Sequence, residues 1–89
     1  MLEKIIRLND NIIWRTIEGE AVLLNQATGD YYGLNSVGCS FWEKIDGSRT
    51  VAEIIQLLMR EYDVPEAAVT RDVLELIAEM QRQGLLYVR

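Results

Sequence analysis

Two side-chain types, cysteine and histidine, limit the chemistry that this chain can perform. Cys39 is the one cysteine among 89 residues, and histidine is absent. A cysteine nucleophile is normally activated by a neighbouring base, most often histidine, and protein zinc sites draw on several cysteine or histidine ligands. The sequence therefore excludes an internal disulfide, a Cys–His nucleophile pair and a Cys/His zinc site within one chain. We interpret Cys39 as a small buried residue and expect no catalytic residue, no metal and no cofactor.

Carboxylates are the other groups with chemical potential, and they are spread along predicted helix faces. The chain has 14 Asp and Glu residues against 9 Lys and Arg residues, a net charge of −5. Asp72, Glu75 and Glu79 follow one another at helical spacing. General acid–base chemistry needs a carboxyl with a raised pKa, which a solvated helix face does not provide. Nucleic acid is held mainly by basic side chains on phosphates, so we expect this acidic chain to bind no nucleic acid.

The overall composition is typical of an ordinary globular domain. Apolar residues make up 49% and charged residues 26% of the chain, and its length is sufficient for one small core. We therefore expect a single domain over residues 1–89. No run approaches the roughly 18 apolar residues of a membrane span, and residues 1–11 lack the apolar core of a signal peptide. The expectation is a cytoplasmic protein with no membrane partner.

Three short strands are predicted in the first third of the chain. Residues 12–17 and 20–25 are rich in β-branched and other apolar side chains, and the Glu-Gly pair between them fits a tight turn. A second glycine-containing turn precedes a strand over residues 30–34. These strands form an antiparallel meander with residues 30–34 at its edge. Residues 4–8 either extend the first strand or lead into it, and the pattern leaves both alternatives open.

The apolar spacing then changes from that of strands to that of helices. Thr50 and Glu53 have the spacing of a capping box, and glycines mark the ends of the first and third helices. The predicted fold class is α+β and winged-helix-like, with a three-stranded antiparallel sheet followed by three helices. The predicted helices run from Asn35 or Ser36 to Asp46-Gly47, from Thr50 to about Tyr62, and from Pro65 to about Gln83.

The third predicted helix has more apolar surface than a small core needs. Its apolar residues form two stripes, one of Val69, Val73, Leu76 and Met80 and the other of Leu74 and Ile77. A helix packed on one side buries an arc of roughly 100°, and two stripes exceed that arc. Either this helix is buried on two sides, or one stripe is a surface for a partner.

The third predicted strand contains two adjacent tyrosines, Tyr31 and Tyr32. Neighbouring residues of a strand point to opposite faces, so one tyrosine can complete the core, and in a peptide-binding domain the other would line a groove. An edge strand is a template for an added strand, and many peptide-binding domains use such an edge. If the N–H of Tyr32 lies at this edge, Tyr32→Pro should abolish peptide binding. The residues alone leave a peptide groove and a simple completion of the core equally open.

The order and spacing of several short motifs resemble the PqqD-like proteins over about residues 12–88. The matching motifs are Val22-Leu23-Leu24, Thr28-Gly29, Tyr32, Leu34-Asn35, Gly38, Trp42, Asp46-Gly47, Thr50, Ile54, Asp72-Val73 and Gly84-Leu85-Leu86.

The resemblance implies a winged-helix-like domain that recognises the leader of a ribosomally synthesised, post-translationally modified precursor peptide. The leader adds as a strand beside the third strand and packs against the third helix, and a modifying enzyme receives the precursor. The aromatic turn at residues 28–32 is most similar to the stand-alone proteins of lasso-peptide clusters, which act with a separate leader peptidase. The alternatives are the member acting in pyrroloquinoline quinone synthesis, a winged-helix DNA-binding regulator, and a structural subunit of a larger enzyme in which a permanent partner covers the edge at Tyr31 and Tyr32.

The same resemblance assigns the peptide contacts by position. Leu74 and Ile77 are the alternative helix contacts, because the sequence does not say which stripe faces the groove. The expected partners are the precursor leader peptide and a separate leader peptidase or maturation enzyme. The expected peptide-binding residues are Asp30, Tyr31, Tyr32, Gly33 and Leu34 in the strand and Val69, Asp72, Val73 and Leu76 in the helix.

Overall fold

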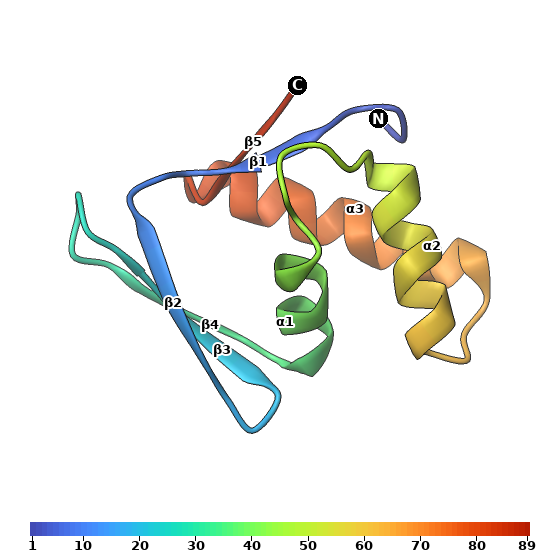
Figure 1. Ribbon diagram of the computed structural model, residues 1–89, viewed down its shortest axis with the longest axis horizontal. Helices are drawn as coiled ribbons and strands as arrows, with labels where there is room; N and C mark the ends of the chain where they lie inside the picture. Colours follow the sequence, from blue (N-terminus) through green and yellow to red (C-terminus); the bar gives the residue numbers. More distant parts are fainter.

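A three-stranded antiparallel sheet forms one side of the protein (Figure 1). The computed structural model describes all 89 residues. The sheet contains β2 (Ile12–Ile17), β3 (Glu20–Asn25) and β4 (Tyr31–Leu34), in the order β2-β3-β4. The turn between β2 and β3 has two positive φ angles, 51° at Glu18 and 79° at Gly19, as a tight hairpin turn requires. The predicted meander is confirmed, and β4 is an edge strand.

Three helices follow the sheet, and the first of them packs on it. They are α1 (Ser36–Glu43), α2 (Val51–Glu61) and α3 (Glu66–Arg82), and α1 packs on β3 and β4. The predicted α+β fold, a three-stranded sheet followed by three helices, is therefore confirmed. The capping box at the start of α2 forms as the sequence indicates. None of these helices combines the length and the apolar character needed to cross a membrane.

The first helix is shorter than predicted. It ends at Glu43, because the chain turns at Lys44, and Asp46-Gly47 lies in the following loop. The carboxylate of Asp46 accepts hydrogen bonds from the backbone N–H groups of Ser48 and Arg49 at 2.9 and 2.8 Å. The Asp-Gly pair therefore organises the connection to α2 instead of ending α1.

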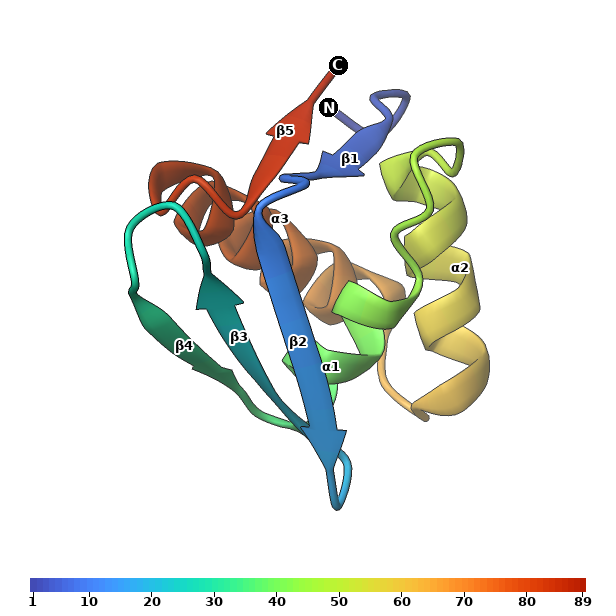
Figure 2. The same ribbon diagram turned by 60° about the vertical axis from the view of Figure 1, so that its left-hand side comes forward.

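A second sheet joins the two ends of the sequence. Strands β1 (Ile6–Leu8) and β5 (Leu86–Val88) pair antiparallel, and Figure 2 shows them beside the two chain ends, apart from the larger sheet. The sequence pattern left open whether residues 4–8 extend the first predicted strand or lead into it. The pairing shows that β1 belongs to a separate sheet and does not extend β2.

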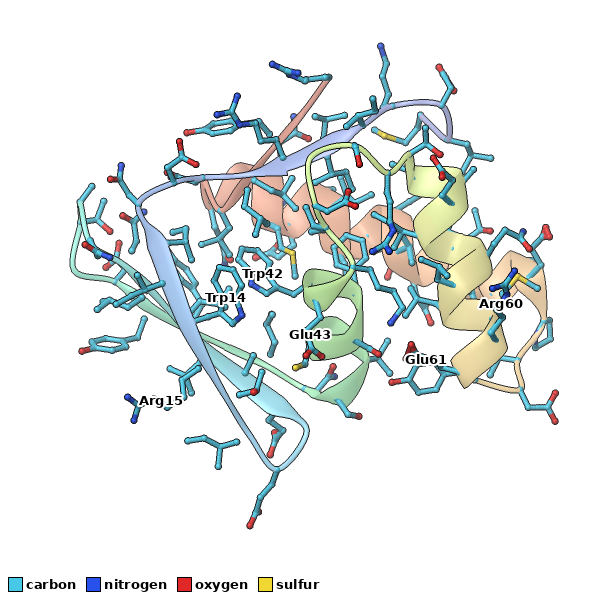
Figure 3. The ribbon with its side chains drawn as sticks, viewed as in Figure 1. Trp14, Arg15, Trp42, Glu43, Arg60 and Glu61 are labelled. Atoms are coloured by element: carbon cyan, nitrogen blue, oxygen red, sulfur yellow. The ribbon has the colours of Figure 1, made fainter.

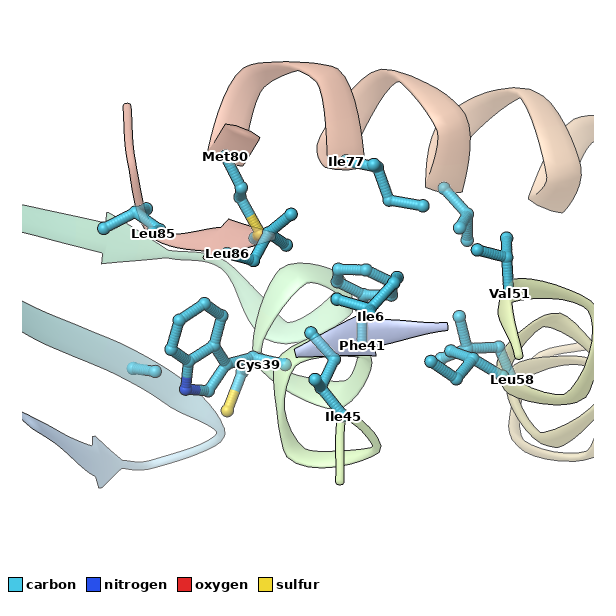
Figure 4. Packing of buried hydrophobic residues seen from close by; sticks show 14 of the residues in the cluster. Ile6, Cys39, Phe41, Ile45, Val51, Leu58, Ile77, Met80, Leu85 and Leu86 are labelled. Carbon is cyan, nitrogen blue, oxygen red and sulfur yellow. The ribbon is translucent and has the colours of Figure 1, made fainter. Parts of the chain in front are cut away.

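The core lies between the sheets and the helices (Figure 4). Phe41 and Trp42 of α1 are fully buried, and the ring of Trp14 in β2 meets the ring of Trp42 edge to face at 5.6 Å (Figure 3). Helix α3 contributes one continuous buried stripe, whose members are Val69, Val73, Ile77 and Met80.

The two predicted stripes of the third helix were divided wrongly. Ile77 belongs to the buried stripe, while Leu76 is half-buried on one flank of it and Leu74 on the other. With 3.6 residues per turn, positions 73, 77 and 80 fall on nearly the same side of a helix. The helix therefore has one core stripe, with Leu76 at one edge of it and Leu74 at the other.

Candidate functional site

Strand β4 is held in place by an asparagine at each end. Before the strand, the side-chain oxygen of the buried Asn25 accepts the N–H of Ala27 at 2.9 Å, which shapes the turn between β3 and β4. After the strand, the side-chain oxygen of Asn35 accepts the N–H of Gly38 at 2.9 Å and caps α1. A Cβ at Gly38 would lie 3.4 Å from the Cβ of Leu34, so glycine permits the close approach of α1 to β4.

The backbone of β4 alternates between its neighbour β3 and open space. The N–H of Asn25 donates to the carbonyl oxygen of Asp30 at 2.9 Å, and hydrogen-bonded pairs of an antiparallel ladder recur at every second residue. In the observed register, the backbones of Tyr32 and Leu34 therefore face β3. The N–H and C=O groups of Tyr31 and Gly33 face outward. We call these four groups the strand edge.

This alternation corrects two expectations about the tyrosines. The N–H of Tyr32 faces β3, so the expectation that Tyr32→Pro would test the free edge is wrong. The side chain of Tyr32 is half-buried against the core, while that of Tyr31 is 72% exposed on the face away from the helices. The tyrosine outside the core thus does not line a groove against α3, and its backbone N–H and C=O groups face the open edge of β4.

The four predicted residues of α3 lie together around one small apolar hollow. Its volume is about 100 Å³, and Asp72 is its single charged residue. The hollow lies between α3, the first turn of α1 and the end of α2. We call it the helix pocket, and its lining is Val37, Leu58, Tyr62, Val64, Val69, Asp72, Val73 and Leu76.

Sequence reasoning missed the part of the helix pocket that lies outside α3. Val37 comes from α1, and Tyr62 and Val64 come from the connection between α2 and α3. Val37 and Val64 are both exposed large apolar side chains. An apolar residue next to a proline in an otherwise polar connection was an available signal for Val64. The alternative contact Leu74 lies on the other flank of α3, and Ile77 is in the core.

The strand edge and the helix pocket are neighbours along the chain. Leu34, the last residue of β4, is followed by the cap Asn35, and Val37 of the helix pocket lies two positions later. Tyr32 and Leu34 are half-buried on the face of the sheet that meets the helices. Asp30 lies in the turn before β4, where its N–H donates to the hydroxyl of Thr28 at 3.3 Å. No residue of β4 lines the helix pocket itself.

The remaining chemical candidates do not form a reactive centre. Cys39 is buried, and its burial, with the neighbouring carboxylate of Glu43, raises the pKa of the thiol. A raised pKa lowers the fraction of reactive thiolate. No three His, Cys, Asp or Glu side chains are arranged to hold a metal ion.

An open sheet edge together with an apolar hollow is the combination that domains recognising peptides by strand addition use. A family model described as "Coenzyme PQQ synthesis protein D (PqqD)" matches residues 20–86. The chain therefore belongs to the PqqD family.

Two curated relatives are similar in sequence to part of this chain. The PqqA binding protein of Gluconobacter oxydans (strain 621H) is 40% identical over 43 residues, which are 48% of this chain and 45% of that protein. The PqqA binding protein of Xanthomonas oryzae pv. oryzae (strain PXO99A) is 36% identical over 53 residues, 60% of this chain and 58% of that protein. The matched segments span about half the length of these relatives.

Two solved structures match almost the whole fold. The structure "TbiB1 in Complex with the TbiA(beta) Leader Peptide" has a TM-score of 0.83 and 30% identity, and covers 90% of this chain and 93% of that chain. The structure "Lasso peptide synthetase B1 complexed with the leader peptide" has a TM-score of 0.81, with 92% of this chain and 96% of that chain covered. Its identity is 24%, so this second likeness concerns the fold alone.

Proposed function

We propose that this protein is a non-enzymatic adaptor that binds the leader of a ribosomally synthesised precursor peptide. The leader adds as a strand to β4 and places an apolar side chain in the helix pocket. One observation carries the proposal: an open edge strand is followed within three residues by a residue of the helix pocket, Val37, in a chain that is 30% identical to a leader-bound protein over 90% of its length. The protein then delivers the precursor to a separate leader peptidase or maturation enzyme.

Each predicted site residue has a distinct role in this proposal. Tyr31 and Gly33 supply backbone hydrogen bonds, and Tyr32 and Leu34 form the apolar floor beneath the added strand. Asp30 flanks the strand at its entrance. The helix pocket receives the anchor through Val69, Val73 and Leu76, while Asp72 adds one polar group at the rim.

The expected affinity follows from a few terms. Four backbone hydrogen bonds each contribute a net ~1 kcal/mol, and one buried apolar anchor contributes roughly 1.5–3 kcal/mol. Ordering a flexible peptide costs several kcal/mol in return. Further contacts along the groove bring the expected Kd into the micromolar to nanomolar range, about −8 to −12 kcal/mol.

A lasso-peptide leader is favoured over the precursor of pyrroloquinoline quinone. The likeness to TbiB1 extends over 90% of this chain, whereas the PqqA binding proteins match 48% to 60% of it. The aromatic turn at residues 28–32 also resembles that of the stand-alone lasso-cluster proteins. The binding mode is the same in either case, because it depends on β4 and α3.

DNA binding is disfavoured by the charges of α3. Its acidic residues outnumber its basic ones, and both arginines are paired within the helix. Arg71 lies 3.7 Å from Asp72, and Arg82 pairs with Glu79. No free basic stripe remains on α3 to contact phosphates.

Titration calorimetry with the leader half of a precursor peptide encoded beside the gene tests the proposed function. At two salt concentrations we expect similar affinities and a negative heat-capacity change, because apolar burial and backbone pairing dominate. A duplex DNA of matched charge should not bind. Failure of the folded protein to bind this leader would contradict the proposal.

A further inference from the structure

A strand added to β4 brings a specific peptide residue opposite Gly33. This step rests on the proposed function, because it needs a leader strand at the strand edge. The backbone of Gly33 faces that edge, and Val22 of β3 lies directly opposite Gly33 on its other side. Directly opposed residues share one face of a sheet. The side chain of the new peptide residue therefore lies on the outer face, level with Gly33 and Val22.

Nothing within the chain explains a glycine at position 33. Its φ does not lie in the left-handed region, so other residues can adopt its conformation. A Cβ at this position would meet no atom within 4 Å. Glycine inside a strand destabilises the fold relative to alanine, because it loses more conformational freedom on folding. Such a glycine commonly marks a place where another chain or a ligand approaches closely.

A hollow adjoins Gly33 at the end of the sheet near the β2–β3 turn. Its outer side is formed by residues of the outward-facing row, while Ala21 and Leu34 line it from the side that faces the helices. The hollow measures about 400 Å³, and Ile17, Val22 and Gly33 are among the residues that line it. The side chains of Ile17 and Val22 are 57% and 45% exposed, unusually open for large apolar residues. Glu18 and Glu20 also line the hollow, and neither makes an ion pair. We call this hollow the Gly33 notch.

We infer that the Gly33 notch receives a bulky apolar side chain, aromatic or branched aliphatic, from the leader residue that pairs with Gly33. This side chain lies across the glycine and packs on Val22, as large residues cover glycines in paired strands. The two glutamates on the rim disfavour an acidic residue at this leader position. Gly33 is thus a specificity-determining residue, acting on the face of the sheet opposite to the helix pocket.

The leader is the occupant because strand pairing itself fixes the distance. Directly opposed residues have Cβ atoms roughly 5 Å apart, so the leader residue reaches the notch as soon as the strand forms. The notch also lies on the edge strand, which makes it continuous with the strand edge. A separate protein would reach the notch only over the leader side chain.

Two substitutions at Gly33 and one matched control test this inference. Gly33→Ala and Gly33→Val fill the notch in two steps, and the Cβ that both introduce meets no atom of the chain within 4 Å. Arg15→Val places the same side chain on the same face and in the same cross-strand row, because Arg15 opposes Val22 and Val22 opposes Gly33. Strands β3 and β4 lie between Arg15 and the added peptide. Figure 3 shows Arg15 pointing away from the helices. The probe is the precursor leader, with a set of single-alanine variants.

We expect graded losses of leader affinity, smaller for Gly33→Ala and roughly tenfold or more for Gly33→Val, as for one buried apolar side chain. Arg15→Val should leave the affinity unchanged. One leader position should carry a bulky, non-acidic residue whose replacement by alanine weakens leader binding to the wild-type protein by a factor similar to that of Gly33→Val. With the Gly33→Val protein, the same alanine leader should bind almost as well as the unchanged leader does.

Each other outcome has a definite meaning. Equal affinity of the wild type and Gly33→Val, or additive losses at every leader position, would overturn the notch and leave strand addition intact. Slower maturation with Gly33→Val at unchanged leader affinity would assign the notch to the enzyme and overturn the inference. If the folded wild type does not bind the leader, the proposed function fails, and this inference fails with it.

Discussion

Tyr31 and Tyr32 are adjacent in the sequence, but the alternation of a strand gives them opposite surroundings. Tyr32 packs on the core and its backbone pairs with β3, while Tyr31 is exposed and its backbone faces the open edge. Side-chain burial and backbone availability are therefore inversely related here. Of the two tyrosines, the one that packs on the core, Tyr32, contributes no backbone group to the strand edge.

Tyr31→Pro is expected to weaken leader binding roughly five- to tenfold, because it removes one edge N–H worth ~1 kcal/mol and its ring obstructs the added strand. The fold should persist, since the lost N–H has no partner in β3. Calorimetric titration with the leader measures the loss, and circular dichroism checks the fold. Tyr31→Ala keeps the N–H and reports the effect of the side chain alone.

Thr16→Pro is the matched change at the other edge of the sheet. The N–H of Gln26 donates to the carbonyl of Asn11 at 2.9 Å, so the same alternation leaves the Thr16 backbone facing outward from β2. This variant should bind the leader as the wild type does. Equal losses in Tyr31→Pro and Thr16→Pro would contradict strand addition at β4.

At the scale of elements, α3 presents two flanks that the sequence could not distinguish. Leu76 lies in the helix pocket with residues of α1 and the α2–α3 connection. Leu74 lies among residues of α3 alone. An anchor side chain gains more contacts in a hollow formed by several elements than on the surface of one helix. The Leu76 flank is therefore the one we assign to the leader.

Leu76→Lys and Leu74→Lys form a matched pair, since each replaces a half-buried leucine on one flank of the same helix. We expect Leu76→Lys to weaken leader binding roughly tenfold or more, because a charge replaces one apolar wall of the helix pocket. Leu74→Lys should change the affinity by less than about twofold. Melting temperatures show whether both variants stay folded. A larger loss with Leu74→Lys would place the groove on the other flank.

Local patterns predicted those elements whose cause is local. The bounds of β2 and β3 follow from apolar runs on either side of a tight turn, and the start of α2 follows from the Thr50–Glu53 capping box. The β1–β5 sheet was not found, because its strands are short and lie at opposite ends of the sequence. The place of Ile77 was misjudged, since apolar spacing gives a periodicity and not the direction of the core.

The candidate site shows the same division between local and non-local information. The four α3 residues carried over by resemblance share one pocket, because they lie within two turns of one helix. Val37, Tyr62 and Val64 join them only through the packing of three elements, which no spacing in the sequence encodes. The Gly33 notch depends on strand register, and a shift of one residue would reverse every side chain.

On the scale of the whole molecule, the helix pocket depends on how α1 and α2 are held together. The ammonium of Lys44, after α1, pairs with the carboxylate of Glu61 at the end of α2, and the hydroxyl of Ser40 donates to the same carboxylate. Figure 3 shows Glu61 on the side of α2 that faces α1. Tyr62, the next residue, lines the helix pocket and donates to the carbonyl of Ser36 at 3.4 Å. This cluster therefore fixes two walls of the pocket.

The same cluster makes part of the stability dependent on pH. The hydrogen bonds from Lys44 and Ser40 hold the pKa of Glu61 below its ordinary value of 4.5. A carboxyl whose pKa is lower in the folded state stabilises the fold above its unfolded value, and this contribution is lost as pH falls through the folded value. The side chain of Glu61 is 43% exposed, so the pair contributes less than about 1 kcal/mol.

Glu61→Gln is therefore expected to lower the melting temperature slightly at pH 7 and to have no effect once the pH has fallen below the lowered pKa of Glu61, where the wild-type carboxyl is already protonated. Thermal melts of both proteins across this range measure the difference. Asp46 and Glu3 also have lowered pKa values, so both proteins lose some stability in acid. Only the difference between the two melting temperatures isolates the contribution of Glu61. A constant difference at every pH would show that Glu61 stabilises the protein through packing and not through its charge.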